Sequence, residues 1–215
     1  MDSRSGLSGA RQPNHEPRLQ RFFQFIEDKS QPGISADESK AAVFLPETDL
    51  QENFADDYHL LGILRLIFEN PTTPPIRPHS IRSRYTKIFA ILLCVDRGNY
   101  IPHFEHHDSL SDEKLPFDQP PDHFPLDIAA PSFFKDFQEQ QWRFCAPKLN
   151  FGRSKFWQPA RVLPITSREP LGAGGSATTF KIVVHPEYNE LNANRNNKEV
   201  KYSKFFQELY IRVTS

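Results

Sequence analysis

The sequence has few cysteines, few glycines, almost no net charge and no long apolar run. Its two cysteines, Cys94 and Cys145, lie far apart, which excludes a disulfide-rich scaffold but leaves a single disulfide bond open. A net charge of −1 gives no basic field for nucleic acid. No stretch is long enough to span a membrane, and the first residues lack the apolar core of a signal peptide. We therefore expect an intracellular protein, cytoplasmic or nuclear, that binds neither nucleic acid nor membrane.

Aromatic residues and prolines are abundant instead. The chain contains 19 Phe, 6 Tyr and 2 Trp, which supply enough bulk for a hydrophobic core. Its 19 prolines against 9 glycines predict many rigid connections and no single long sheet. The sequence divides into a polar tail over 1–17, expected to be disordered, a helical region over 18–150, and a separate C-terminal segment over 161–215. These features indicate an α+β fold.

Apolar residues at helical spacing predict four helices. They cover residues 19–26, about 49–68, about 81–96 and 132–144. Thr48 and Gln51 have the spacing of a capping box before the second helix. Ser80 is the expected cap of the third helix, and Gly98 is its expected stop.

The segments between these helices are interpreted mostly as loops. Ser30 to Glu38 contains a Pro-Gly pair, which is typical of a turn. Residues 100–104 fit either a short strand or a loop anchored in the core. Residues 109–131 are rich in proline, which predicts a segment that crosses the surface of the protein. Within it, Leu115 and Phe117 are expected to be buried in the core.

Three clusters carry residue types that occur in functional sites. The run from His103 to Asp108 holds three histidines and two carboxylates, but its spacing is not that of a zinc site. An exposed polar loop is the favoured interpretation, a pH-sensitive patch is the alternative, and no metal ligand is predicted. Arg82, Arg84 and Lys87 form a basic helix face, which we interpret as solvated and not as a DNA-reading surface.

Cys145, His123 and Asp118 together are the residue types found in the catalytic site of a thiol hydrolase. No family signature surrounds this cysteine, which follows the aromatic-rich Trp142-Arg-Phe144. A buried structural thiol is therefore expected, and no catalytic residue is predicted.

The most informative stretch begins at Leu171. This stretch contains Gly172, Gly174 and Gly175. Glycines allow positive φ angles and a close approach of backbone N–H groups to a ligand. A strand is predicted directly afterwards, from Thr178 to Val184, with alternate apolar residues on one face. The pattern is therefore strand, glycine turn, strand.

The stretch Leu171-Gly-Ala-Gly-Gly-Ser-Ala-Thr-Thr-Phe-Lys-Ile182 resembles the glycine-rich loop of eukaryotic Ser/Thr protein kinases. Together with Arg161-Val-Leu-Pro-Ile165 and His185-Pro186, it is most similar to kinase-like proteins of filamentous fungi, in which a helical region precedes the kinase domain. The resemblance covers about the last quarter of the chain. Ala177 and Thr179 replace the third glycine and the valine of the family pattern, and Ser176 stands where an aromatic residue often lies.

The resemblance implies that residues 161–215 form an incomplete kinase N-lobe hairpin. Weak contact with ATP, with Mg²⁺, is then expected from the backbone around eight residues: Leu171, Gly172, Ala173, Gly174, Gly175, Ser176, Ala177 and Thr179. Members of the family phosphorylate Ser or Thr at the expense of ATP.

Catalysis by this chain is not expected, because the motifs V-A-I-K, H-R-D and D-F-G are absent from it. Lys201 or Lys204 is a candidate for the lysine on the third strand of a kinase, and Glu208 for its partner glutamate on the next helix, and both assignments rest on an assumed spacing. The leading hypothesis is thus a truncated, ATP-binding-type kinase-like protein. The alternative is a non-enzymatic interaction module whose helical region binds a protein partner.

Overall fold

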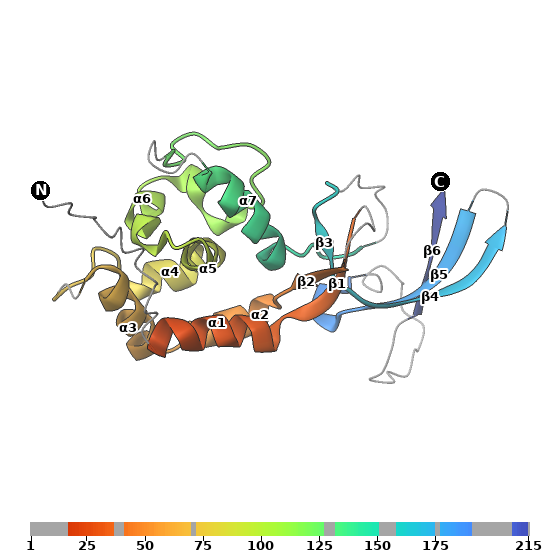
Figure 1. Ribbon diagram of the computed structural model, residues 1–215, viewed down its shortest axis with the longest axis horizontal. Helices are drawn as coiled ribbons and strands as arrows, with labels where there is room; N and C mark the ends of the chain where they lie inside the picture. Colours follow the sequence, from red (N-terminus) through yellow and green to blue (C-terminus); the bar gives the residue numbers. More distant parts are fainter. Residues whose placement is uncertain are drawn as a thin grey trace, which may run out of the picture.

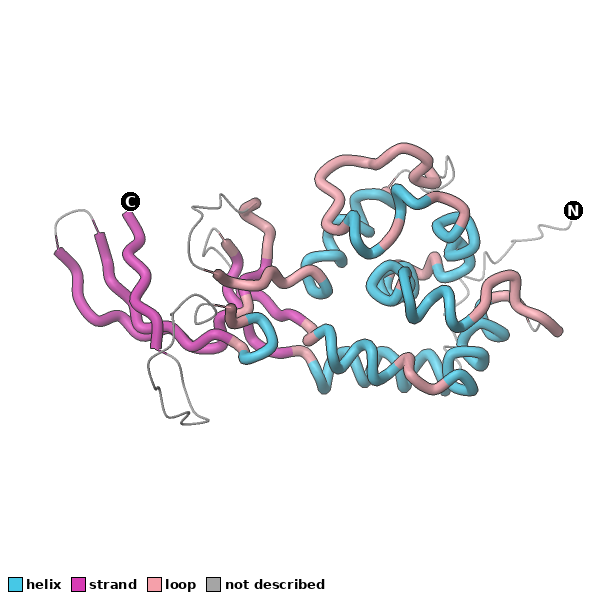
Figure 2. The backbone as a smooth tube through the Cα atoms, turned by 180° about the vertical axis from the view of Figure 1, so that it is seen from behind, coloured by secondary structure: helices cyan, strands magenta, loops and turns pink. Residues whose placement is uncertain are grey.

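The computed structural model describes residues 17–36, 41–69, 72–126, 132–150, 158–174, 177–190 and 208–214. The tail predicted over 1–17 lies outside these residues, apart from Pro17. The described residues combine α-helices with two small antiparallel sheets, which confirms the α+β prediction. The helices gather at one end of the molecule and the strands at the other, as Figure 1 shows from one side and Figure 2 from behind.

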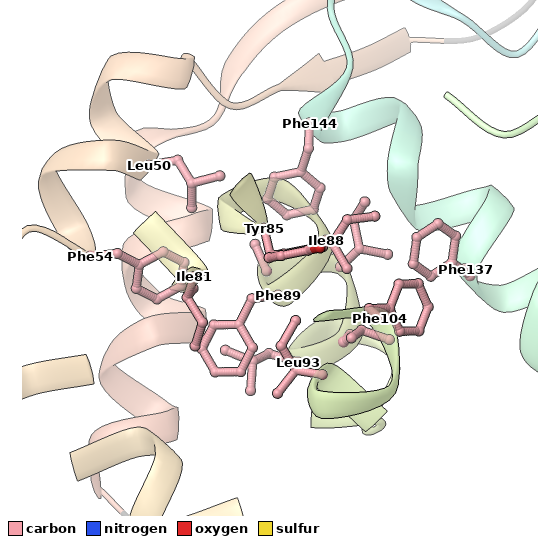
Figure 3. Packing of buried hydrophobic residues seen from close by; sticks show 14 of the residues in the cluster. Leu50, Phe54, Ile81, Tyr85, Ile88, Phe89, Leu93, Phe104, Phe137 and Phe144 are labelled. Carbon is pink, nitrogen blue, oxygen red and sulfur yellow. The ribbon is translucent and has the colours of Figure 1, made fainter. Parts of the chain in front are cut away.

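The helical body is built around one apolar helix. Within the described residues, its α-helices are α1 (Pro17–Lys29), α2 (Glu47–Asn53), α3 (Asp57–Ile67), α4 (Pro78–Arg84), α5 (Thr86–Cys94), α6 (Ile101–Glu105) and α7 (Phe133–Phe144). Every residue of α5 from Ile88 to Leu93 is buried. Figure 3 shows α5 side chains between Leu50 and Phe54 on one side and Phe104 and Phe137 on the other. A helix that is apolar on all sides is stable only at the centre of such a core.

The first and last predicted helices are confirmed as α1 and α7. In α1, Phe22 and Ile26 are buried, as their spacing predicted. In α7, the buried aromatic residues are Phe133, Phe137, Trp142 and Phe144. The amphipathic pattern identified these helices because each buries one stripe against α5 or its neighbours.

The second predicted helix is in fact two helices, α2 and α3. The break follows Asn53, and the side chain of Asp56 caps α3 by accepting a hydrogen bond from the Tyr58 N–H at 2.9 Å. Aspartate favours such cap positions over a helix interior, since its side chain competes for backbone N–H groups. The capping box at Thr48 is wrong, because α2 begins at Glu47 without a side-chain cap from its own N-cap residue.

The third predicted helix is also divided, into α4 and α5, at the buried residue Tyr85. Thr86 stabilises the break, because its Oγ1 lies 3.1 Å from the carbonyl oxygens of both Ile81 and Arg82. The helix begins at Pro78 and not after Ser80, since proline suits a first turn.

Residues 100–104 were expected to be a strand or a loop, and this was wrong. They follow a 3-10 turn, Gly98–Tyr100, and form most of α6, with Pro102 in its first turn. The crossing segment beyond α6 includes two more 3-10 turns, Asp108–Leu110 and Asp112–Lys114. Phe117 is buried and Leu115 is half-buried, as predicted.

The first sheet corrects the loop predicted over Ser30 to Glu38. Strand β1 (Gln31–Ser35) lies between β2 (Ala41–Phe44) and β3 (Val162–Leu163), and both pairings are antiparallel. A Cβ on Gly33 would lie 2.8 Å from the carbonyl oxygen of Leu163, so the glycine permits close strand approach and does not mark a turn. Strand β3 pairs only with Ile34 and Ser35, which leaves Pro32 with one neighbouring strand.

The second sheet is an arm of three antiparallel strands. Strand β5 (Ala177–Val184) lies between β4 (Ile165–Gly174) and β6 (Glu208–Thr214). The strands extend away from the helical body (Figure 1). The base of the arm is buried through Ile165, Ile182 and Val184, which pack with Ile34 and Leu163 of the first sheet. The two sheets are therefore joined by a shared apolar cluster.

Candidate functional site

The glycine-rich stretch forms the tip of the hairpin between β4 and β5. Gly174 pairs with Ala177 and Gly172 pairs with Thr179. Gly175 and Ser176, between these strands, lie outside the described residues. The register shifts between Pro170 and Gly172, so Leu171 is at an irregularity of β4. The structure thus brings together the backbone of six predicted site residues, which are Leu171, Gly172, Ala173, Gly174, Ala177 and Thr179.

The hairpin is anchored at its base and along one face. Ile182 and Val184 are buried, and Phe180 is half-buried on the same face, as period-two spacing predicted. The Arg168 guanidinium carbon lies 3.5 Å from the centroid of the Phe180 ring. Such a cation–π contact between paired strands adds to the backbone ladder. The glycine tip therefore extends from a packed base.

The joint between the arm and the helical body lies at a 3-10 turn, Pro186–Tyr188. The Glu187 carboxylate accepts hydrogen bonds from the N–H groups of Glu47, at 3.0 Å, and Thr48, at 3.3 Å. Tyr188 Oη also accepts from the Glu47 N–H at 3.0 Å, and the Tyr188 ring packs edge-on against Phe44. Burial raises the pKa of Tyr188, so its hydroxyl stays protonated at neutral pH.

The sequence analysis did not indicate this joint, because Glu187 and Tyr188 lie in the polar, asparagine-rich run from His185 to Glu199, whose composition is that of a loop. The available signal was Tyr188, two positions after Pro186 in a mostly polar run. A tyrosine side chain has a large apolar area to bury and a hydroxyl that usually finds a hydrogen-bond partner when buried. The ring against which Tyr188 packs, Phe44, comes from β2, more than a hundred positions earlier.

The residues suggested for kinase-like roles beyond the hairpin are only partly described. Lys201 and Lys204 lie outside the described residues. The helix role for Glu208 is wrong, because Glu208 begins strand β6 and pairs with Val183. Alternating Leu, Ile and Val residues favour a strand there. In the same ladder, Arg212 pairs with Thr179.

The histidine-rich run is ordered and not a simple polar loop. His103 belongs to α6, His107 follows it, and His123 reaches them from the crossing segment. The rings of His107 and His123 are parallel, with centroids 4.3 Å apart. Within the described residues, no group of three or more His, Cys, Asp or Glu side chains is arranged to hold a metal ion.

Each cation of the predicted basic face is paired with a carboxylate. Arg82 lies 2.8 Å from Asp57, Arg84 lies 2.7 Å from Asp108, and Lys87 lies 2.7 Å from Glu47. All three pairs are at least partly exposed, so each contributes little to stability. They do, however, offset the positive charge that a phosphate backbone would contact.

The backbone of Lys87 also takes part in a part-buried polar contact that the sequence did not indicate. The Asp112 carboxylate accepts hydrogen bonds from the N–H groups of Lys87 and Ile88, both at 2.9 Å, at the start of α5. This carboxylate therefore caps the central helix from another segment. Burial raises the pKa of Asp112 to about 6.

Both cysteines are free thiols, so the single disulfide bond left open by the sequence is not formed. Cys145 is buried, as expected, and burial raises its pKa to about 12. Burial likewise raises the pKa of Cys94 to about 12. Because the thiolate is the reactive form, these surroundings suppress nucleophilic chemistry at either sulfur.

Comparison with known proteins gives no match: none of the protein-family models, curated proteins or solved structures compared with this chain matches it. Among the described helices, none combines the length and the apolar character needed to cross a membrane. The class defined by the fold is an α+β protein with a helical body and a glycine-tipped antiparallel arm.

Proposed function

We propose that the β4–β5 hairpin is an ATP-binding-type glycine-rich loop and that the chain is the N-terminal portion of a protein-kinase-like protein. The observation that carries this proposal is the element order around the glycines. Gly172 and Gly174 end one strand, the turn follows, and an antiparallel strand returns from Ala177. A dinucleotide-binding or Walker loop would lead into a helix, whereas a kinase glycine loop leads into a strand.

The third strand supports the same proposal and limits it. A kinase carries its ATP-binding lysine on the strand after the glycine hairpin, within V-A-I-K. Strand β6 pairs antiparallel with β5. Within it, the stretch Leu209-Tyr-Ile-Arg212 places an arginine, and not a lysine, in register with Thr179. Arginine does not substitute freely for lysine, because its planar guanidinium has different geometry. ATP contact without phosphoryl transfer is therefore the proposed activity, with Mg²⁺ accompanying the nucleotide.

The test is a titration of the purified chain with a fluorescent ATP analogue in the presence and absence of Mg²⁺. Gly174→Val should abolish binding, because a branched side chain blocks close approach of the backbone to phosphate. Ala177→Gly, which restores the third glycine of the pattern, should preserve or strengthen binding. Both variants should keep the helical circular dichroism of the wild type. Equal nucleotide binding by wild type and Gly174→Val would refute the proposal.

A second candidate, a non-enzymatic interaction module, is favoured by one exposed aromatic residue. Tyr58 is 71% exposed on α3, and the Arg18 guanidinium carbon lies 5.4 Å from its ring centroid. Tyrosine and arginine are enriched in the hot spots of protein interfaces. A partner whose binding is lost in Tyr58→Ala but is unaffected by Mg-ATP and by Gly174→Val would support this function over nucleotide binding.

A further inference from the structure

Three histidine rings, which we call the histidine stack, join α6 to the crossing segment 118–126. They are His103, His107 and His123. The centroids of His103 and His107 are 5.0 Å apart, and those of His107 and His123 are 4.3 Å apart with nearly parallel planes. Face-to-face imidazole rings tolerate this spacing when they are neutral, but two imidazolium cations at the same spacing repel each other.

A hydrogen bond holds the stack in register. His103 Nε2 lies 2.7 Å from the backbone carbonyl oxygen of His123, and a carbonyl can only accept, so Nε2 carries a proton and donates. His123 has a left-handed backbone, with φ of 66°, which turns this carbonyl back toward α6. Next to it, Ser109 Oγ donates to the carbonyl oxygen of Asp122 at 3.2 Å.

The start of the same segment is fixed by groups that do not titrate. The fully buried Gln141 amide accepts from the Phe117 N–H at 2.8 Å and donates to the Phe117 carbonyl at 2.9 Å. Further along, Phe124 packs against the aromatic rings of Phe104 and Phe137. The segment is therefore bound at one end by an amide and at the other by the histidine stack and Phe124.

The ionisable groups around the stack are of both signs. Its ionisable neighbours along α6 and the crossing segment are Glu105, His106, Asp108, Asp118 and Asp122. Asp108 is already paired with Arg84, at 2.7 Å. Partial burial lowers the pKa of His107, and the nearby charges of His123, His103 and His106 lower it further.

We propose that the histidine stack is a proton-sensitive latch that releases segment 118–126, including Phe124, in mildly acidic solution. Protonation of two stacked rings separates His123 from His107 and removes the support of the His103 hydrogen bond. Phe117, just before the segment, stays bound to Gln141, so the segment opens from its far end and keeps its attachment to α7. Opening uncovers the aromatic rings under Phe124 and gives the helical body a surface that exists only at low pH.

The experiment is amide hydrogen exchange with mass spectrometry on the full chain at about pH 7.5 and about pH 5.5, corrected for intrinsic rates. In the wild type, exchange over 118–126 should be about tenfold faster at the lower pH, a change of the size expected when opening removes the stabilisation of one hydrogen bond. Exchange over α7, residues 133–144, serves as the internal reference and should not change.

Two variants separate charge from packing. His107→Phe keeps an aromatic ring in the stack but takes up no proton, so the acceleration should disappear. His123→Asn removes the charge on the other partner and tolerates the left-handed backbone, so it gives a second test if His107→Phe folds poorly. His79→Gln, a change at an exposed histidine on α4, is the matched control and should respond like the wild type. Unchanged exchange in the wild type, or acceleration that persists in both stack variants, would overturn the latch.

Discussion

The Oε1 atom of Glu187 lies 3.0 Å from the backbone nitrogen of Glu47, 140 positions earlier in the chain. Helix α2 therefore takes its cap from the segment that follows the glycine hairpin. Its own N-cap residue, Pro46, makes no side-chain cap bond. A carboxylate at a helix N-terminus satisfies free N–H groups and also interacts favourably with the helix dipole. The arm and the helical body thus share a stabilising contact.

Removing this cap should destabilise the whole protein. We expect Glu187→Ala to lower the free energy of unfolding by about 1 kcal/mol, and Glu187→Gln by less, since the amide oxygen still accepts a hydrogen bond. Urea unfolding monitored by circular dichroism measures both. Glu190→Ala is the control, because the Glu190 carboxylate makes exposed contacts, an ion pair with Lys148 at 3.4 Å and a hydrogen bond from Asn150 Nδ2 at 3.5 Å, and its loss should change stability by less than about 0.5 kcal/mol. Equal effects of the two alanine variants would contradict the cap.

Asp112 should make the protein less stable as the pH rises, whereas a carboxylate whose pKa is lowered by folding makes it more stable. Burial raises its pKa from 3.8 to about 6, so the folded state binds this proton more tightly than the unfolded chain does. Its contribution to stability is therefore fully present below pH 3.8 and is lost as the pH rises through about 6.

Asp112→Asn stays neutral and should lack this dependence. Relative to the wild type, the variant should gain about 2 to 3 kcal/mol in unfolding free energy between acidic and neutral pH. Urea unfolding of both proteins across that range gives the difference directly, and contributions from other titrating groups cancel in the comparison. Parallel stability curves for the two proteins would show that Asp112 is not the responsible group.

Two glycines in different elements, Gly33 in β1 and Gly62 in α3, should respond differently to alanine. In Gly33→Ala, the new Cβ would lie 2.7 Å from Val162 Cγ1 and 2.8 Å from the Leu163 carbonyl oxygen, so strands β1 and β3 must separate. We expect a loss of about 1 to 3 kcal/mol. In Gly62→Ala the three atoms nearest to the new Cβ all belong to the flexible Arg18 side chain, which must move aside, and alanine favours the helix by up to about 1 kcal/mol. Thermal unfolding of both variants compares their stabilities. A melting temperature that falls more in Gly62→Ala than in Gly33→Ala would contradict the prediction.

The chain should transfer no phosphoryl group. Positioning and metal coordination supply most of the catalysis in kinases, and the sequence contains neither H-R-D nor D-F-G. Incubation with radiolabelled ATP and Mg²⁺ should leave both the chain and a generic protein substrate unlabelled. Labelling that disappears in Gly174→Val would show that this prediction is wrong.

Local periodicity predicted the helices whose burial is simple. Phe22 and Ile26 in α1, and Phe133 and Phe137 in α7, repeat at helical spacing and are buried. The breaks after Asn53 and at Tyr85 could not be predicted in this way. The residues at both breaks, Phe54 and Tyr85, are apolar and buried, so the apolar stripe continues although the helix does not.

Other misses depend on pairing between segments. Pro32-Gly33 has the composition of a turn, and its pairing with Val43 and Ala42 of β2 makes it part of a strand. The hairpin itself was predictable, because Gly174 and Ala177 are local partners. The attachment of the hairpin to the helical body was not predictable, because Glu187 acts as a cap for a helix that starts 140 positions earlier.

The central place of β1 in the first sheet has a consequence for synthesis of the protein on the ribosome. Ser35 pairs with Val162, so one edge of β1 waits for a strand that is made about 130 residues later. At typical elongation rates of about 5 to 20 residues per second, that edge stays open for roughly 6 to 26 seconds. An unpaired strand edge is a template for wrong pairing with other chains. The nascent protein is therefore most vulnerable to aggregation after its helices have emerged and before Val162 has been added.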